Sequence, residues 1–282
     1  MKKYSYYNRK ILFGMLFATL IALASLGSIL GTASATNGPD VNATIPPPGG
    51  TLPRSGSGIK LIHLAPFDDD PIVSAQLSGA GTVIQYNNLD LGSATTGYLN
   101  VTPGTVSVNI SSTTGTSVSL SNQVAIDTDY TYAVIGGANG WPVEIWPLVD
   151  TTLVPDSGTG KVRIVHVAPF APKPTDNELP TDTQVNIVTQ SGERVDSAFE
   201  GLLYQESSSF VTMPAGIYDW KVVLPSGDVL VDLPIFQLFN KAVVTLYIVG
   251  DGDVQSPAGL LVINETGEEI IYLYMAAIRW QN

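Results

Sequence analysis

A nine-residue segment occurs twice in the chain, and this internal repeat limits the fold more than any other feature. Residues 59–67 read Ile-Lys-Leu-Ile-His-Leu-Ala-Pro-Phe, and residues 162–170 read Val-Arg-Ile-Val-His-Val-Ala-Pro-Phe. The His-x-Ala-Pro-Phe core is identical apart from x, and every other difference is a like-for-like exchange. Self-similarity of this kind indicates that a structural unit was duplicated.

Two further landmarks follow each copy in the same order. Pro103-Gly104 corresponds to Pro214-Ala215-Gly216, and residues 132–136 (Tyr-Ala-Val-Ile-Gly) correspond to residues 246–250 (Leu-Tyr-Ile-Val-Gly). The spacing between copies grows from 103 to 114 residues, and we assign the insertions to the Pro-rich stretch 172–182. We therefore expect two copies of one domain, over 58–150 and 161–263, joined by a linker over 151–160.

The polarity of both copies alternates with a period of two, which is typical of half-buried strands. Val106, Val108 and Ile110 alternate with Ser107, Asn109 and Ser111, and Tyr218, Trp220, Val222 and Leu224 alternate with Asp219 and Lys221. Turn residues such as Pro225-Ser226-Gly227-Asp228 separate the runs, and no helix is indicated after residue 35. The pattern predicts an all-β fold of two tandem β-sandwich domains, Ig-like or transthyretin-like, with seven or eight strands in roughly 100 residues each.

The two ends of the chain differ from the repeats. Residues 1–35 combine Lys2, Lys3, Arg9 and Lys10 with an uncharged apolar run and a closing Ala33-Ser34-Ala35, which predicts a signal peptide cleaved after Ala35. An uncleaved anchor is the alternative, because about 20 apolar residues suffice to cross a bilayer. Residues 36–57 have the Pro/Gly/Ser composition of a linker. The apolar tail 264–282 is either a sorting or donated strand or a last strand packed on the second domain.

Charge and cysteine content exclude several classes of function. Four of the 13 basic residues and none of the 25 acidic residues lie in 1–35, so the remainder has a net charge of −16. Such a surface repels phosphate backbones and anionic lipids, so we expect no nucleic-acid partner and no binding to anionic membrane surfaces. We also expect no membrane span after signal cleavage, because the apolar run 270–278 near the C-terminus is too short to cross a bilayer as a helix. The absence of cysteine excludes disulfides, thiolate metal sites and cysteine nucleophiles.

The repeated motif resembles a known family. A basic-apolar strand, His-x-Ala-Pro, a Pro-Gly or Pro-Ala-Gly turn and a Tyr/Val-rich strand ending in Gly are similar to the DUF4397 domain of secreted bacterial and archaeal proteins. The resemblance covers about 59–150 and 161–263 and implies a β-sandwich and an extracytoplasmic location. The chain departs from the family after the first Pro, where Asp-Ala-Pro is usual and residues 67–71 read Phe-Asp-Asp-Asp-Pro. No established activity comes with the family.

The two histidines of the chain, His63 and His166, occupy equivalent repeat positions. A metal ligand or general base is one interpretation, but no nucleophile motif such as Gly-x-Ser-x-Gly accompanies either ring. We instead expect each ring to face inward and to hold the loop after its strand. His63, Pro66, His166 and Pro169 are therefore assigned to a structural repeat motif, and the chain is expected not to be an enzyme.

Acidic clusters and glycosylation sequons are the next candidates. Calcium prefers several converging oxygen ligands, and the candidate ligands are Asp68, Asp69, Asp70, Asp251 and Asp253. No complete calcium motif is present, and turn-forming Asp on solvated loops is the alternative, so no cofactor is predicted beyond this calcium candidate. Asn42, Asn100, Asn109 and Asn264 begin Asn-x-Ser/Thr sequons and are candidate glycosylation acceptors.

Aromatic residues around the loop 136–140 give a candidate binding surface. Tyr130 and Trp146 flank this glycine-rich loop, and Trp141 precedes Pro142 at its exit, where we expect it at the surface. Exposed aromatic rings can stack on sugars, whereas a sandwich Trp is more often part of the core. The sequence thus predicts a non-catalytic exported protein with a structural or adhesive role toward cell-surface polymers or envelope proteins. The alternative is a carbohydrate-binding module centred on Trp141, and neither the ligand nor the oligomeric state follows from the sequence.

Overall fold

The computed structural model describes residues 57–65, 72–79, 82–95, 97–150, 154–175, 178–233, 235–250, 260–264 and 272–274. Contacts divide the chain into residues 1–47 and one compact unit, 48–282, to which all described residues belong. The described residues are all-β, as predicted, and contain no α-helix, only the 3-10 turns η1 (Thr181–Thr183) and η2 (Ser197–Phe199). The signal peptide and most of the linker 36–57 lie outside the described residues.

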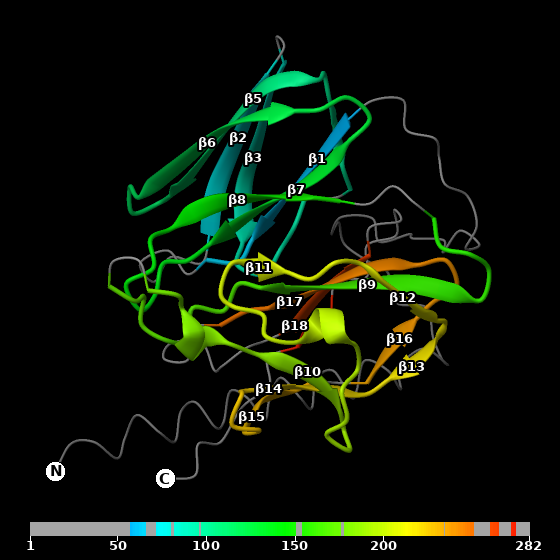
Figure 1. Ribbon diagram of the computed structural model, residues 1–282. Helices are drawn as coiled ribbons and strands as arrows, with labels where there is room; N and C mark the ends of the chain where they lie inside the picture. Colours follow the sequence, from blue (N-terminus) through cyan, green and yellow to red (C-terminus); the bar gives the residue numbers. More distant parts are fainter. Residues whose placement is uncertain are drawn as a thin grey trace, which may run out of the picture. The chain divides into compact units, whose positions relative to one another are not determined.

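The N-terminal half (57–150) is a sandwich of two four-stranded sheets (Figure 1). One sheet has the order β4-β1-β7-β8, called here the first inner sheet, and the other has the order β3-β2-β5-β6, called the outer sheet. Their facing side chains form one core. The strands are β1 (Ser57–His63), β2 (Ile72–Gly79), β3 (Thr82–Asp90), β4 (Leu99–Val101), β5 (Gly104–Ser112), β6 (Ser117–Val124), β7 (Asp129–Ile135) and β8 (Glu144–Val149).

The alternation predicted for residues 106–111 is confirmed. Val106, Val108 and Ile110 on β5 are buried against the first inner sheet, whereas Ser107 and Asn109 are exposed. This follows from the period of a strand, in which successive side chains point to opposite faces. The sandwich is thus built by polarity patterns that can be read in the sequence.

The C-terminal half (154–274) also packs sheets face to face. Its six-stranded sheet has the order β11-β9-β17-β18-β19, with β12 also pairing with β9, and is called the second inner sheet. The sheets β10-β14-β15 and β13-β16 cover one of its faces. The strands are β9 (Thr159–His166), β10 (Asn186–Thr189), β11 (Glu206–Ser207), β12 (Val211–Pro214), β13 (Gly216–Tyr218), β14 (Trp220–Val223), β15 (Val229–Asp232), β16 (Phe236–Leu238), β17 (Val243–Ile248), β18 (Leu260–Asn264) and β19 (Tyr272–Tyr274).

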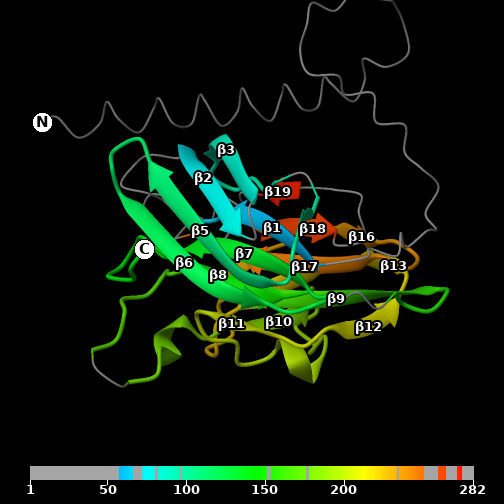
Figure 2. The same cartoon turned by 90° about the horizontal axis from the view of Figure 1, so that it is seen from above.

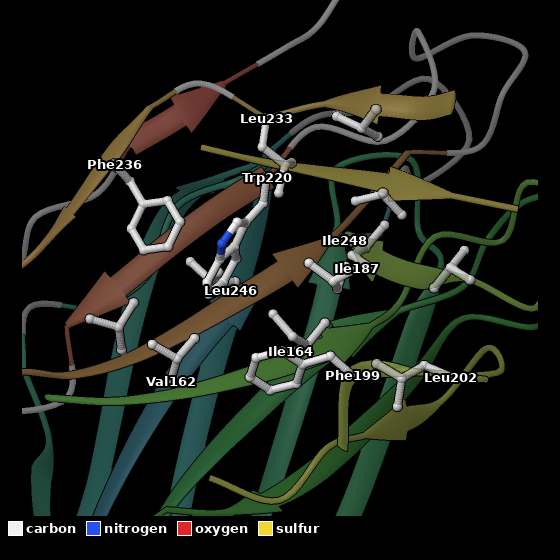
Figure 3. Packing of buried hydrophobic residues seen from close by; sticks show 14 of the residues in the cluster. Val162, Ile164, Ile187, Phe199, Leu202, Trp220, Leu233, Phe236, Leu246 and Ile248 are labelled. Atoms are coloured by element: carbon white, nitrogen blue, oxygen red, sulfur yellow. The ribbon is translucent and has the colours of Figure 1, made fainter. Parts of the chain in front are cut away.

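Trp220 lies at the centre of this second core (Figure 3). Its ring packs at 4.9 Å from Phe236 and 6.0 Å from Phe199, measured between ring centroids. The alternation predicted over 218–224 holds at Trp220 and Val222, but Val223 is buried too, because a bulge shifts the register between Val222 and Val223. The Ig-like or transthyretin-like order of connections stays a prediction.

The internal repeat coincides with the same strand pair in each half. β1 pairs in parallel with β7, placing Lys60 opposite Thr131. β9 pairs in parallel with β17, placing Arg163 opposite Thr245. The two landmarks that are far apart in each sequence copy therefore lie side by side in the sheet, and the basic residue of the motif faces a threonine both times.

The strands of these parallel pairs are buried on both faces, which explains why the repeated motif does not alternate in polarity. Every residue of β1, β7 and β17 is buried. One face contributes to the core of its own half, and the other contributes to a third cluster shared by the two inner sheets. Ile62 and Ala133 enter this cluster from the first inner sheet, and Val165 and Tyr247 enter it from the second. Parallel strands covered on both sides are expected to be uniformly apolar.

Part of the apolar tail forms a strand of the second inner sheet. β19 pairs antiparallel with β18, with Leu261 opposite Leu273. Residues 272–274 thus extend the second inner sheet, and the role of the tail stays a prediction. The other residues of the tail, apart from Asn264, lie outside the described part of the chain.

Candidate functional site

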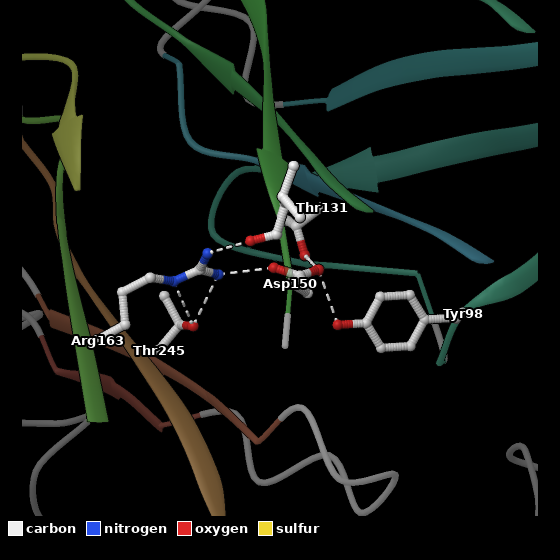
Figure 4. Close-up of polar contacts among 6 residues, drawn as sticks. Tyr98, Thr131, Asp150, Arg163 and Thr245 are labelled. Atoms are coloured by element: carbon white, nitrogen blue, oxygen red, sulfur yellow. Dashed lines mark hydrogen bonds and ion pairs between the residues drawn. The ribbon is translucent and has the colours of Figure 1, made fainter. Parts of the chain in front are cut away.

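The contact between the two inner sheets contains a buried polar network (Figure 4). Arg163 Nη2 lies 2.7 Å from Asp150 Oδ1, and the two side chains are 4% and 1% exposed. Arg163 also donates from Nη1 to the carbonyl oxygen of Val149 at 2.8 Å and from Nη2 to Thr245 Oγ1 at 3.0 Å. The guanidinium of the C-terminal half is thereby bound to the last strand of the N-terminal half.

Asp150 receives hydrogen bonds from both sides of its carboxylate. Its Oδ2 accepts from Thr131 Oγ1 at 2.6 Å and from Tyr98 Oη at 2.8 Å. Lys60 Nζ lies 4.6 Å from the centre of the Tyr98 ring, within the range of a cation–π contact. A buried charge needs such a set of partners, because an incompletely compensated ion in a low-dielectric interior is strongly destabilising.

Trp141 also lies at this contact between the two halves, which is called the junction below. The prediction that Trp141 is at the surface is therefore corrected. The residue is 9% exposed, its Nε1 donates to the carbonyl oxygen of Ala171 at 3.0 Å, and its ring lies 4.2 Å from that of Tyr204. Asn139 in the same loop donates to the carbonyl oxygen of Pro169 at 2.5 Å. The aromatic loop of one half therefore binds the His-x-Ala-Pro-Phe loop of the other.

The other two predicted aromatic residues do not form an exposed platform with Trp141. Tyr130 is 8% exposed and lies in the core of the N-terminal half, and Trp146 is partly buried against the shared cluster. The sequence could not show this, because the residues that cover Trp141 come from positions about 30 and 63 further along the chain.

Gly136 permits the tight path of the aromatic loop. Its φ is +86°, and a Cβ atom at this position would overlap the carbonyl oxygen of Pro142. Only glycine adopts such a conformation without strain while allowing so close an approach. The glycines of this loop thus serve the turn that returns Trp141 to the junction.

Both histidines are completely buried. His166 Nε2 lies 2.7 Å from the carbonyl oxygen of Thr183, and its Nδ1 faces the backbone N–H of Ala168 at 3.4 Å. With the proton on Nε2, the ring donates to Thr183 and accepts from Ala168, so it holds the loop that follows β9. Burial lowers the pKa of His166 from 6.5 to about 4, and the ring is neutral near pH 7.

Burial also raises the pKa values of two groups at the junction, the carboxyl of Glu144 and the hydroxyl of Tyr204. The pKa of Glu144 lies above its usual value because the carboxyl is partly buried, although hydrogen bonding from Gln205 and the charge of Lys173 oppose this rise. The pKa of Tyr204 is raised by burial and, secondarily, by the carboxylate of Glu144. The Tyr204 hydroxyl has no hydrogen-bond partner among the described residues.

Several predicted site residues lie outside the described part of the chain. They are Asn42, Pro66, Asp68, Asp69, Asp70, Asp251 and Asp253. The described residues hold no group of three or more side chains suited to a metal ion. Of the sequon asparagines, Asn100 and Asn109 are exposed, and Asn264 lies in β18.

A polar groove lies in the C-terminal half, away from these residues. It has a volume of about 720 Å³ and is open to solvent. Amide and hydroxyl side chains line it together with the ion pair of Arg194 and Glu200, and Val223, Leu224 and Pro225 provide apolar wall. Sequence reasoning missed this groove, since the loop 191–201 that borders it carries no recognisable motif.

The family comparison agrees with the repeat motif. Residues 57–173 match the model of a domain of unknown function, DUF4397. The resemblance that the repeated motif suggested is thereby confirmed over these residues. The matched segment contains the whole N-terminal half and continues through β9 and the second His-x-Ala-Pro-Phe segment. It therefore includes Arg163 and its partner Asp150.

Other comparisons add no function. No curated protein is similar to the chain. A leucine-rich repeat protein from Bacteroides thetaiotaomicron VPI-5482 matches 70% of this chain at 14% identity with a TM-score of 0.17. The chain spans 26% of that protein's length, and the likeness is too low to support any inference.

Sequence reasoning also missed the polar network. Its one signal was the basic residue inside each apolar repeat strand, Lys60 and Arg163, which is unusual for a buried strand. Nothing in the sequence marks Asp150, which lies at the end of the first copy, as the partner of Arg163.

Proposed function

We propose that the chain is an exported, non-catalytic protein with a structural and adhesive role at the cell surface, and that its second repeat is a diverged DUF4397 domain. The observation that carries the proposal is the junction, where Trp141 of the glycine-rich loop and Arg163 of the repeated motif join the two halves into one unit. Two domains joined through a shared apolar cluster and a buried ion pair act as a rigid spacer rather than as hinged modules.

The burial of both histidines supports a non-catalytic role. A general base must reach the proton that it abstracts, and His63 and His166 are both 0% exposed. His166 is further occupied by Thr183. The tethering role that the sequence suggested for the repeated histidine is the simpler interpretation of this geometry.

Cell fractionation tests export and location. We expect the native protein on the cell surface with Thr36 as its first residue, determined by intact mass and N-terminal mapping. A variant with Ala33→Leu and Ala35→Leu should retain residues 1–35, because leucine does not fit the small-residue cleavage pattern. Recovery of the unaltered chain in the cytoplasm would overturn the proposal, and recovery as a free protein in the medium would remove the envelope role.

The groove favours a second candidate, a binder of neutral glycans. The amide groups and the Arg194–Glu200 ion pair can hydrogen-bond to sugar hydroxyl groups, and together they carry no net charge. The apolar wall suits the C–H faces of sugars. Arg194→Gln should weaken retention on a polysaccharide that the chain binds. Lys241→Gln removes the same charge at an exposed site outside the groove and should leave retention unchanged. Equal retention of both variants would exclude the groove.

A further inference from the structure

β6 forms an open edge of the outer sheet (Figure 2). It pairs with β5 on one side, and no described strand pairs with it on the other. An edge strand presents a row of main-chain N–H and C=O groups that can bind a further strand. β6 is eight residues long, which exceeds the usual strand length of about five or six residues.

This edge lacks the features that usually prevent strand addition. Residues 117–124 include no charged residue, no proline and no glycine, and the pairing with β5 has no bulge. Other edges are protected, since β8 contains Glu144 and Pro147, and β15 is short and ends in Asp232. β3, at the opposite edge of the outer sheet, pairs through a bulge and has Asn88 at a φ of +60°.

The hairpin between β5 and β6 determines which residues of β6 turn their main-chain N–H and C=O groups toward the open edge. The N–H of Ser112 donates to the carbonyl of Thr116 at 2.9 Å. Bonded pairs alternate along an antiparallel ladder, so Val118, Leu120 and Asn122 bond toward β5. The intervening residues direct their main-chain groups to the open edge; these are Ser117, Ser119, Ser121 and Gln123.

The electrostatics of the chain favour this place for contact between copies. The chain carries a net charge of −12, so most of its surface repels a second copy. Residues 72–124 contain a single charged residue, Asp90. The side chains on the solvent face of β2, β5 and β6 are uncharged: Ser74, Gln76, Ser78, Thr105, Ser107, Asn109, Ser111, Ser117, Ser119, Ser121 and Gln123.

We propose that β6 pairs antiparallel with β6 of a second copy of this chain, on a two-fold axis through Leu120. Cross-strand neighbours must lie on the same face, so Leu120 meets the second copy's Leu120 on the core side. Ser119 then faces the second copy's Ser121 on the solvent side. Val118 and Leu120, half-buried at the sandwich edge, become covered. The two outer sheets form one continuous sheet of eight strands, a contact that extends the proposed structural role and does not depend on export.

Sedimentation of the full chain with charge-pair variants tests both the contact and its register. The unaltered chain should have the mass of a dimer. Ser119→Lys with Ser121→Lys sets lysines opposite one another across the axis and should give monomers, whereas Ser119→Lys with Ser121→Asp sets opposite charges together and should remain dimeric. The control, Ser107→Lys with Asn109→Lys, adds equal charge on the central strand β5 and should remain dimeric. Circular dichroism verifies that each variant is folded.

Cysteine cross-linking gives an independent measurement, because the chain has no cysteine. Leu120 would form a non-hydrogen-bonded pair with its own counterpart, where Cα atoms are about 4.5 Å apart and a disulfide fits. Leu120→Cys should therefore oxidise to a covalent dimer, and Val118→Cys, which faces Asn122 instead, should not. A monomeric unaltered chain, or equal cross-linking of both variants, would overturn the proposal. It would leave the surface location determined by fractionation unaffected.

Discussion

Removal of the Arg163 guanidinium is the perturbation that most directly tests how the two halves are joined. Arg163→Met keeps much of the side chain's length and removes its charge. Asp150 would then be left 1% exposed without its cation, and the carbonyl of Val149 would lose its donor. The effect should therefore appear as a loss of stability of the whole described unit.

The magnitude follows from the partners that remain. Breaking a buried ion pair by removing one member destabilises by about 3–5 kcal/mol. Asp150 keeps the hydroxyl donors Thr131 and Tyr98, which places the expected loss at the lower end, about 3 kcal/mol. For a unit of this size that corresponds to a decrease in Tm of roughly 6–12 °C.

Two further variants separate the ion pair from simple packing. Arg163→Met with Asp150→Leu removes both charges, and it should recover much of the lost stability because an apolar pair of similar volume requires no buried charge. Arg163→Lys should also be destabilised, since an ammonium group cannot reproduce the simultaneous bonds to Asp150, Val149 and Thr245.

Equilibrium unfolding in urea, followed by tryptophan fluorescence and circular dichroism, measures these differences. Because 48–282 is one compact unit, the two probes should report a single transition with one m-value. A loss below about 1 kcal/mol for Arg163→Met would refute the reasoning, because it falls within the range of exposed pairs. Two separate transitions would also refute it, since the halves would then unfold independently.

Three other perturbations are predicted from the same junction. Gly136→Ala should destabilise by about 3 kcal/mol or more, because its Cβ would overlap Pro142, whereas Gly115→Ala, at a φ of +97° with no atom within 4 Å, should lose only about 1 kcal/mol in urea unfolding. The pKa of His166 is about 4 in the folded state against 6.5 in the unfolded state, so the unfolded state binds the proton first as the pH falls. The free energy of unfolding should therefore fall by about 3 kcal/mol from pH 6.5 to 4. His166→Gln should reduce this pH dependence, and an unchanged pH dependence would contradict the assignment. Trp141→Ala should lower stability by about 3–5 kcal/mol and leave polysaccharide retention unchanged, and a selective loss of retention would restore the glycan interpretation of the aromatic loop.

Those features that depend on strand periodicity and on the repeat could be predicted from the sequence. The burial of Val106, Val108 and Ile110 is fixed by alternation along one strand. The parallel pairs β1–β7 and β9–β17 contain the very segments that repeat, so their equivalence could be read before their position was known. Periodicity succeeds here because it reports which face of a strand is apolar.

The junction could not be predicted from the sequence. Periodicity shows that a strand has an apolar face, but it does not show which other part of the chain covers that face. Trp141 follows a glycine-rich loop and precedes a proline, a context as suitable for an exposed ring as for a buried one. Its cover comes from Ala171 and Tyr204 in the other half. The burial of both faces of β1 fits the run Ile59, Leu61 and Ile62, which does not alternate in polarity.

The two copies of the motif have diverged at the position that matters most for the junction. Lys60 and Arg163 have the same register, each opposite a threonine, yet they have different partners. Arg163 reaches Asp150 and Val149 with separate nitrogens, which needs a planar group with several donors, whereas Lys60 lies over the Tyr98 ring, which needs only a compact charge. Exchange of the two residues should therefore destabilise the unit at both sites. A chain with Lys60→Arg and Arg163→Lys that unfolds at the same urea concentration as the unaltered chain would mean that the position requires positive charge alone.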